Sequence, residues 1–214
     1  MSWEPYLDLD TGVLRNRLAI TDRDELAPAE ADFSAIRIAE LHRHPLPGRY
    51  DLAHLQAFHR HIFAEVYDWA GELRTVFLGK GHLFCLPQHL LTAAAEVFDR
   101  LARADHLRGL ARAGFLDALT ELLADIDALH PFREGNGRAQ RTFLAQLARD
   151  AGHPLRWSGL DPVTNIEASR AAHSGDNTVL HAMLDELVDR TPDGPDAGQV
   201  PMPMPRPPTD DEQP

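Results

Sequence analysis

The sequence is poor in cysteine, in aromatic residues and in basic residues relative to acidic ones. Cys85 stands alone, which excludes an internal disulfide framework and any zinc site made of several cysteines. The 33 Asp and Glu residues outnumber the 21 Lys and Arg residues, and the resulting net charge of -12 has the wrong sign for a nonspecific binder of nucleic acid or anionic membranes. No apolar run approaches the roughly 18 residues of a spanning helix, and residues 1–10 lack a signal-peptide pattern. We therefore expect a cytoplasmic protein that contacts neither membranes nor nucleic acid directly.

The end of the chain differs in composition from the rest. Residues 192–214 hold eight of the sixteen prolines and almost nothing that could be buried. We predict a disordered, acidic tail that is partly polyproline II. Two interpretations stay open for the run at 201–208: a solubilising tail, which is the simpler one, or a segment that docks on an aromatic groove of a partner.

Apolar residues recur at helical spacing through most of the chain before residue 192. The clearest stripe predicts a helix that is buried along one face, and it consists of Phe115, Leu119, Leu122, Ile126 and Leu129. Asp51 has the position of an N-cap for another helix. Further helices are expected at 30–41, at 88–103, from residue 138, and twice between 161 and 190.

The segment 74–86 breaks the helical period. Its runs 74–78 and 82–86 are β-prone and flank Gly79-Lys80-Gly81, which predicts a β-hairpin that leans on the helices. The free edge of such a hairpin offers backbone donors and acceptors to an extended peptide. A purely structural hairpin is equally compatible with this segment.

Isolated histidines and the cysteine give weaker signals. The pairs His42/His44 and His59/His61 are each two positions apart, so neither pair shares a helix face well, and we interpret them as structural rather than metal-binding. Cys85 lies in an apolar run with no adjacent basic residue and is expected to be a core or hairpin residue rather than a nucleophile.

Residues 130–141 read His-Pro-Phe-Arg-Glu-Gly-Asn-Gly-Arg-Ala-Gln-Arg and combine several features of an anion site. Pro131 ends the preceding helix, so His130 lies at the C-terminal end of that helix. Three residues that tolerate unusual backbone conformations follow: Gly135, Asn136 and Gly137. Such a loop turns several backbone N–H groups into one concavity, and the next helix adds the positive end of its dipole.

The charged side chains of this segment favour phosphates. Arg138 and Arg141 fall in the first turn of a helix, where cations are disfavoured by roughly 0.3–1 kcal/mol each, so the site is expected to take a polyanion. Glu134 fits beside phosphates if Mg²⁺ lies between them. His130 is the obvious proton acceptor there. Alone, each residue would be interpreted as a helix cap or a surface charge; together they predict a nucleotide–Mg²⁺ site without a Walker sequence.

The same string resembles the signature of the Fic (filamentation induced by cAMP) family, H-P-F-x-[D/E]-G-N-[G/K]-R-x-x-R, at every fixed position. The stretch 69–74 and the glycine-rich hairpin are similar to the family's lead-in and flap. The resemblance implies an all-α, Fic-type helical bundle with a small β-hairpin flap over the active site. It also implies three parts: an N-terminal helical extension at 1–48, a Fic domain at 49–191 and the tail at 192–214.

The resemblance further implies a protein adenylyltransferase, which moves AMP from ATP to a Ser, Thr or Tyr hydroxyl of a target protein and releases diphosphate. In that role His130 deprotonates the hydroxyl, Glu134 holds Mg²⁺ and Phe132 anchors the loop. The residues expected to bind the ATP phosphates are Gly135, Asn136, Gly137, Arg138 and Arg141. The residues expected to form the target-binding flap are Leu78, Gly79 and Lys80.

The inhibitory motif of many family members, [S/T]-x-x-x-E-[G/N], has no match. Glu25 follows Thr21 at the right distance but precedes Leu26, and Glu96 precedes Val97. The resemblance therefore points to members that are toxins inhibited by a separate small antitoxin protein, for which a type II topoisomerase subunit is a candidate target. Gly137 favours adenylylation over phosphorylation. Three alternatives stay open: an inactive Fic-fold binding module, protein phosphorylation by the same site, and removal of AMP.

Overall fold

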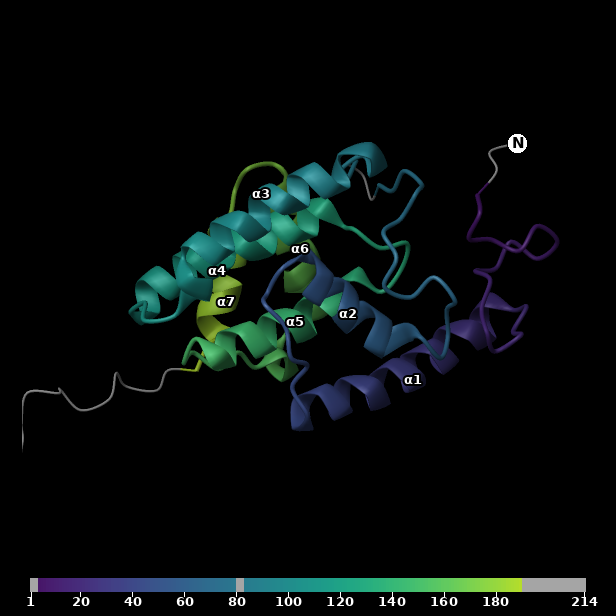
Figure 1. Ribbon diagram of the computed structural model, residues 1–214, viewed down its shortest axis with the longest axis horizontal. Helices are drawn as coiled ribbons and strands as arrows, with labels where there is room; N and C mark the ends of the chain where they lie inside the picture. The colour runs from purple at the N-terminus through teal and green to yellow at the C-terminus, as the bar shows by residue number, and fades with distance from the viewer. Residues whose placement is uncertain (1–3, 80–82, 190–214) are drawn as a thin grey trace, which may run out of the picture.

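Helices make up most of the protein (Figure 1), whose computed structural model describes residues 4–79 and 83–189 of the chain. The helices are α1 Arg23–Arg43, α2 Leu52–Phe63, α3 Leu90–Arg103, α4 Arg112–Leu129, α5 Asn136–Asp150, α6 Pro162–His173 and α7 Thr178–Leu187. Short 3₁₀ turns span Pro87–His89, Asp105–Leu107 and Trp157–Gly159. The predicted all-α fold is confirmed. The predicted tail at 192–214 lies outside the described residues.

Capping aspartates set the starts of three helices, α1, α2 and, through Asp161, α6. Asp22 accepts the backbone N–H groups of the first turn of α1, so this helix begins well before the predicted residue 30 and has Pro28 inside it. Asp51 is the N-cap of α2, as predicted, and its carboxylate accepts the N–H of His54 at 2.8 Å. Among the described residues, no helix has the length and apolarity needed to cross a bilayer.

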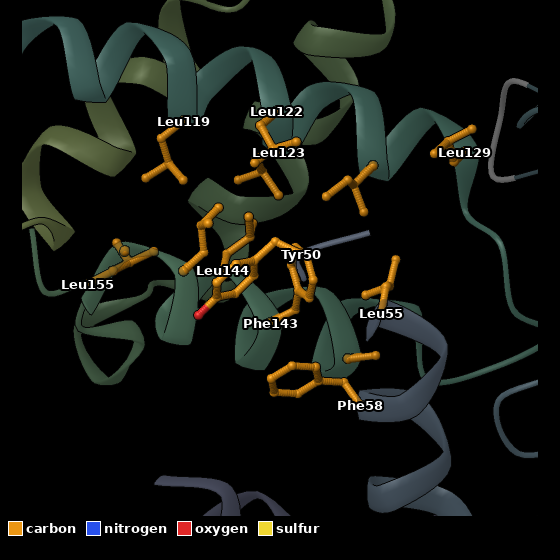
Figure 2. Packing of buried hydrophobic residues seen from close by; sticks show 14 of the residues in the cluster. Tyr50, Leu55, Phe58, Leu119, Leu122, Leu123, Leu129, Phe143, Leu144 and Leu155 are labelled. Carbon is orange, nitrogen blue, oxygen red and sulfur yellow. The ribbon is translucent and has the colours of Figure 1, made fainter. Parts of the chain in front are cut away.

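Helix α4 is the central element of the core. It packs against α3, α5, α6 and α7, and the predicted stripe is confirmed, since Phe115, Leu119 and Ile126 are fully buried. Figure 2 shows the leucines of α4 facing Phe143 and Leu144 of α5. Each such side chain contributes about 1.5–3 kcal/mol through burial. The core therefore fixes α4 and α5 against each other, and with them the loop that joins them.

The N-terminal helix lies along the outside of this core. α1 packs on α2 and reaches α5 (Figure 1). Leu26 and Leu41 of α1 are buried in the same hydrophobic cluster as the side chains of α2 and α4. Residues 23–43 are thereby brought against the beginning of α5, where the motif residues lie.

The predicted β-hairpin is not seen as paired strands in the described residues. An isolated bridge joins Gly79 and Leu83, and residues 80–82, including the predicted flap residue Lys80, lie outside the described part. The physical reason lies in the buried side chain of Arg74. Its guanidinium donates to four backbone carbonyls, which belong to Val76, Cys85, Leu129 and His130. The N–H of Phe84 still donates to the Leu78 carbonyl at 3.1 Å, but other groups that a strand ladder would pair are satisfied by Arg74 and by the end of α4.

Candidate active site

The loop between α4 and α5 borders a cavity of about 360 Å³, which is within the size range of small-ligand sites. The end of α4, the motif loop and the first turns of α5 line one part of it. Leu78, Gly79 and Phe84 line a second part, and α6 closes a third with side chains that include Arg170 and His173. Two of the three predicted flap residues therefore border the same cavity as the motif.

His130 is held at the end of α4 in a left-handed conformation, with φ at 43°. Its N–H donates to the Ile126 carbonyl at 3.1 Å, and its own carbonyl accepts Nε of Arg74 at 2.7 Å. The imidazole stacks on the ring of Phe84, with centroids 3.8 Å apart, and it lines the cavity. Backbone and ring contacts thus fix the direction in which the imidazole points.

Asp127, one helical turn before His130, is a site residue that the sequence analysis did not single out. Its Oδ1 lies 3.7 Å from Nδ1 of His130, and its Oδ2 lies 3.4 Å from Nε2 of His173. Burial alone would raise the pKa of Asp127, but the contact with His130 and the charge of the two histidines outweigh it, so the pKa lies below its usual value. The carboxylate is ionised at neutral pH. The spacing of three residues before a helix-terminal histidine was the available signal.

The motif loop is built by three residues that pair with one another or with α2. Gly135 has φ at 78°, and a Cβ there would lie 2.4 Å from the ring of Phe63, so only glycine fits. The side chain of Asn136 exchanges two hydrogen bonds of 2.8 Å with the backbone of Phe132. Phe132 is 1% exposed and stacks on His59. Asn136 also begins α5, two residues before the predicted start.

His59 ties this loop to α2. Its Nδ1 accepts the N–H of Gly71 at 2.8 Å, which leaves Nε2 to donate to the Glu134 carbonyl at 2.9 Å. Burial lowers the pKa of His59 to about 4, so the ring is neutral at physiological pH. The structural interpretation of His59 is consistent with these contacts, and within the described residues no cluster of His, Cys, Asp or Glu could hold a metal by itself.

Arg141 faces the cavity, close to the backbone of the glycine loop. A Cβ on Gly137 would lie 3.0 Å from Nη1 of Arg141, so glycine at this position lets the guanidinium approach. Burial lowers the pKa of Arg141, and the nearby charge of Arg138 lowers it further. In the described part of the chain Arg141 has no carboxylate within ion-pair distance. A half-buried guanidinium with no acidic partner among the described residues is a strong reason for this cavity to take an anion.

Arg138 turns away from this cavity and toward α1. Its Nη2 forms an ion pair with Glu30, and its Nη1 donates to the Ser34 hydroxyl at 3.0 Å. Its Cζ lies 4.8 Å above the ring of Phe63. Arg138 lines a separate cavity of about 490 Å³ instead. The two motif arginines are three residues apart in sequence, yet the buried carboxylate of α1 directs one of them elsewhere.

Glu134 lies at the edge of both cavities, and its side chain is 46% exposed. Its Oε1 accepts the N–H of Gly135 at 2.9 Å and lies 4.0 Å from Nη2 of Arg138. One accessible carboxylate beside the glycine-rich loop suits Mg²⁺, which typically takes one or two carboxylates and completes its shell with phosphate oxygens and water. The residues present therefore fit a metal that arrives with a nucleotide.

The fold and the loop define a helical protein whose glycine-rich turn carries a histidine at one end and a cavity-facing arginine at the other. The profile of the Fic/DOC family matches residues 49–148, and the chain belongs to this family. It is 41% identical over 188 residues to the probable protein adenylyltransferase y4lH of Sinorhizobium fredii, with 86% of this chain and 96% of the relative covered.

A second relative is the protein adenylyltransferase VbhT of Bartonella schoenbuchensis, with 37% identity over 182 residues. The match covers 85% of this chain but 38% of VbhT, so the chain spans well under half the length of that relative. Among solved structures, the BepC protein with bound AMPPNP from Bartonella tribocorum has a TM-score of 0.81 at 23% identity, covering 86% of this chain and 96% of that one. The predicted Fic-type helical fold is thereby confirmed.

Proposed function

We propose that this protein is an adenylyltransferase that transfers AMP from ATP to a hydroxyl side chain of a target protein. The observation that carries the proposal is that His130 and Arg141 line one cavity on either side of the glycine loop. Relatives covered almost completely by this chain are named as probable protein adenylyltransferases. A protein of the same fold is described with a bound ATP analogue, which supports a nucleotide in this class of fold.

The backbone of the loop supplies the phosphate site. Gly135 provides no side-chain cap to α5, so the first N–H groups of the helix are left for a ligand, at the positive end of its dipole. Arg141 adds a full positive charge at the same place. Arg138 can join the phosphates only if its guanidinium leaves Glu30 and Ser34.

In the reaction, the oxygen of the target hydroxyl forms a bond to the α-phosphorus of ATP while its proton passes to Nε2 of His130. The bond between the α-phosphorus and the oxygen that bridges to the β-phosphate breaks, and diphosphate leaves. Mg²⁺ held by Glu134 would supply neutralisation of the phosphate charge. The chain's own work is to position the phosphates, exclude water with the rings around His130 and accept one proton.

The target is proposed to lie in an extended conformation beside residues 77–79 and Leu83. Leu78 and Gly79 border the cavity, and Phe77 and Leu83 expose 65% and 71% of their surface beside it. Exposed apolar side chains next to a reactive site suit a peptide segment. Lys80 of the predicted flap is part of this proposal, and a type II topoisomerase subunit is the candidate target that the family resemblance implies.

Control by a separate antitoxin protein is proposed on the basis of Arg141. The described residues provide no acidic partner for it, and we propose that a separate chain supplies the carboxylate that blocks the phosphate site. A small protein that presents a glutamate to this guanidinium would neutralise the charge and exclude ATP. The test is to copurify such a protein and to measure ATP affinity with and without it. It should lower the affinity of the wild type but not that of Arg141→Ala.

Labelled ATP tests the proposed function directly. Label from the α-phosphate should appear in protein, with a matching AMP adduct in mass spectra of host lysate treated with enzyme and ATP. Label from the γ-phosphate alone would overturn the proposal in favour of phosphorylation, and no label at all would favour an inactive binding module. His130→Ala should abolish transfer and leave ATP affinity nearly intact, whereas joint loss of both would show that the histidine is structural.

A further inference from the structure

Nδ1 of His130 is a buried ring nitrogen that faces the carboxylate of Asp127. The side chains of His130 and Asp127 are 12% and 14% exposed, and Nδ1 of His130 has no hydrogen-bond partner among the described residues. An unpaired buried polar atom costs about 1–3 kcal/mol. Oδ1 of Asp127, at 3.7 Å, needs only a small movement to accept a hydrogen bond from the N–H at Nδ1. Catalytic hydrogen bonds are often this long before substrate binds.

Three helices meet at the carboxylate of Asp127. It belongs to α4, Nε2 of His173 from α6 lies 3.4 Å from Oδ2, and Nε2 of Gln140 from α5 lies 3.5 Å from Oδ1. All three side chains line the cavity. Contacts from three elements fix the position of the carboxylate more firmly than one helix could. An ionised carboxylate accepts hydrogen bonds but donates none, so it selects a protonated nitrogen on the ring that it faces.

The stacked ring of Phe84 fixes the plane of the imidazole. The two rings are nearly parallel, at 10°, and their centroids are 3.8 Å apart. With the plane fixed by Phe84 and Nδ1 directed at Asp127, the other ring nitrogen, Nε2, is the one left for a ligand in the cavity. The neutral imidazole has one protonated nitrogen, so a proton on Nδ1 leaves the lone pair on Nε2.

We propose that Asp127 is a positioning residue, which holds His130 in the tautomer protonated at Nδ1 so that Nε2 can take the proton of the target hydroxyl. After that transfer the ring carries a positive charge, and the same carboxylate stabilises it. Asp127 touches neither substrate nor phosphate and acts through His130. The inference rests on the proposed AMP transfer for its purpose, and the tautomer itself can be measured without any reaction.

The first experiment measures the tautomer in the wild-type protein. Long-range ¹H–¹⁵N spectra of ¹⁵N-histidine-labelled protein separate protonated from unprotonated ring nitrogens, and the His130 signals are those absent from His130→Ala. We expect a proton on Nδ1 of His130 and a bare Nε2 at neutral pH. A proton on Nε2, or an even mixture of the two tautomers, would overturn the inference whether or not the protein transfers AMP.

The second experiment separates positioning from structure by kinetics. Asp127→Asn keeps the size of the side chain and should lower kcat for AMP transfer on the order of 10²-fold, the lower end of what a positioned general base contributes, with KM for ATP nearly unchanged. Asp125→Asn is the matched control: it removes another carboxylate of α4, paired with Arg100 and outside the cavity, and should leave kcat unchanged.

A double variant completes the design. In a His130→Ala background, Asp127→Asn should have no further effect on residual transfer, because a positioning residue has nothing left to position. Equal losses in both backgrounds, or a wild-type kcat in Asp127→Asn, would refute the inference while leaving AMP transfer intact. Absence of transfer in the wild type would instead refute the proposed function, and the tautomer measurement would still decide the role of Asp127.

Discussion

Lowering the pH should destabilise the active-site loop, because His59 then becomes protonated. This histidine bridges Gly71 and the Glu134 carbonyl and stacks on Phe132, so it holds the loop only as a neutral ring with an acceptor at Nδ1. A second proton would occupy Nδ1 and abolish the bond from the Gly71 N–H. It would also place a buried charge near Arg138.

The magnitude follows from the pKa of His59. Burial lowers it from 6.5 to about 4, and the charges of Arg138 and Arg60 act in the same direction. The unfolded chain, with an ordinary imidazole, takes up the proton first as the pH falls. The stabilising contribution is therefore complete above about pH 6.5 and is lost between about pH 6.5 and 4. A difference of this size corresponds to roughly 3 kcal/mol of unfolding free energy.

Urea unfolding at a series of pH values measures this contribution. We compare the wild type with His59→Gln, because the difference between their unfolding free energies cancels all other titrating groups. That difference should shrink by about 3 kcal/mol between pH 7 and pH 4. A difference that stays constant over this pH range would refute the assignment of a buried, neutral ring to His59.

Three further changes have defined outcomes. Glu30→Gln leaves the guanidinium of Arg138 half-paired in a buried place and should lower the unfolding free energy by about 1–3 kcal/mol, measured in urea; no change would show that the ion pair contributes nothing. Gly135→Ala should cost several times more stability than Gly152→Ala, because both have positive φ but Gly135 alone meets an α2 ring; equal losses in thermal melts would contradict this. Deletion of 193–214 should leave Tm and transfer unchanged, and a large fall in Tm would refute the predicted disordered tail.

Local patterns were sufficient to predict the helices around the site. The apolar period of α4 and the cap at Asp51 depend on residues within a few positions of one another, and both are confirmed. The position of His130 at a helix end followed from Pro131 alone. The combination of glycines, arginines and a histidine in twelve consecutive positions predicted an anion site, because the loop brings them together without help from distant segments.

Contacts between distant segments could not be predicted in this way. Arg138 and Glu30 are 108 residues apart, and nothing in the spacing of the motif indicates that a helix near the N-terminus takes this guanidinium. The hairpin prediction was not met for a similar reason. The residues of its two runs do favour strands in sequence. However, Arg74 donates hydrogen bonds to carbonyls of both the 74–86 segment and the end of α4, and this contact between distant segments cannot be predicted from local sequence.

The motif contains two groups of residues that should respond differently to substitution. Phe132 and Asn136 make their contacts within the fold of the loop, and the ring of Phe63 leaves room only for glycine at 135. Changes at these three positions should therefore lower Tm and activity together. His130 and Arg141 present free atoms to the cavity, so changes there should lower kcat or ATP affinity at nearly unchanged Tm. The half-buried guanidinium of Arg141 has no acidic partner in the described part of the chain, which is a cost to folding that an anionic ligand offsets. ATP should therefore raise Tm in the wild type and lose that effect in Arg141→Ala.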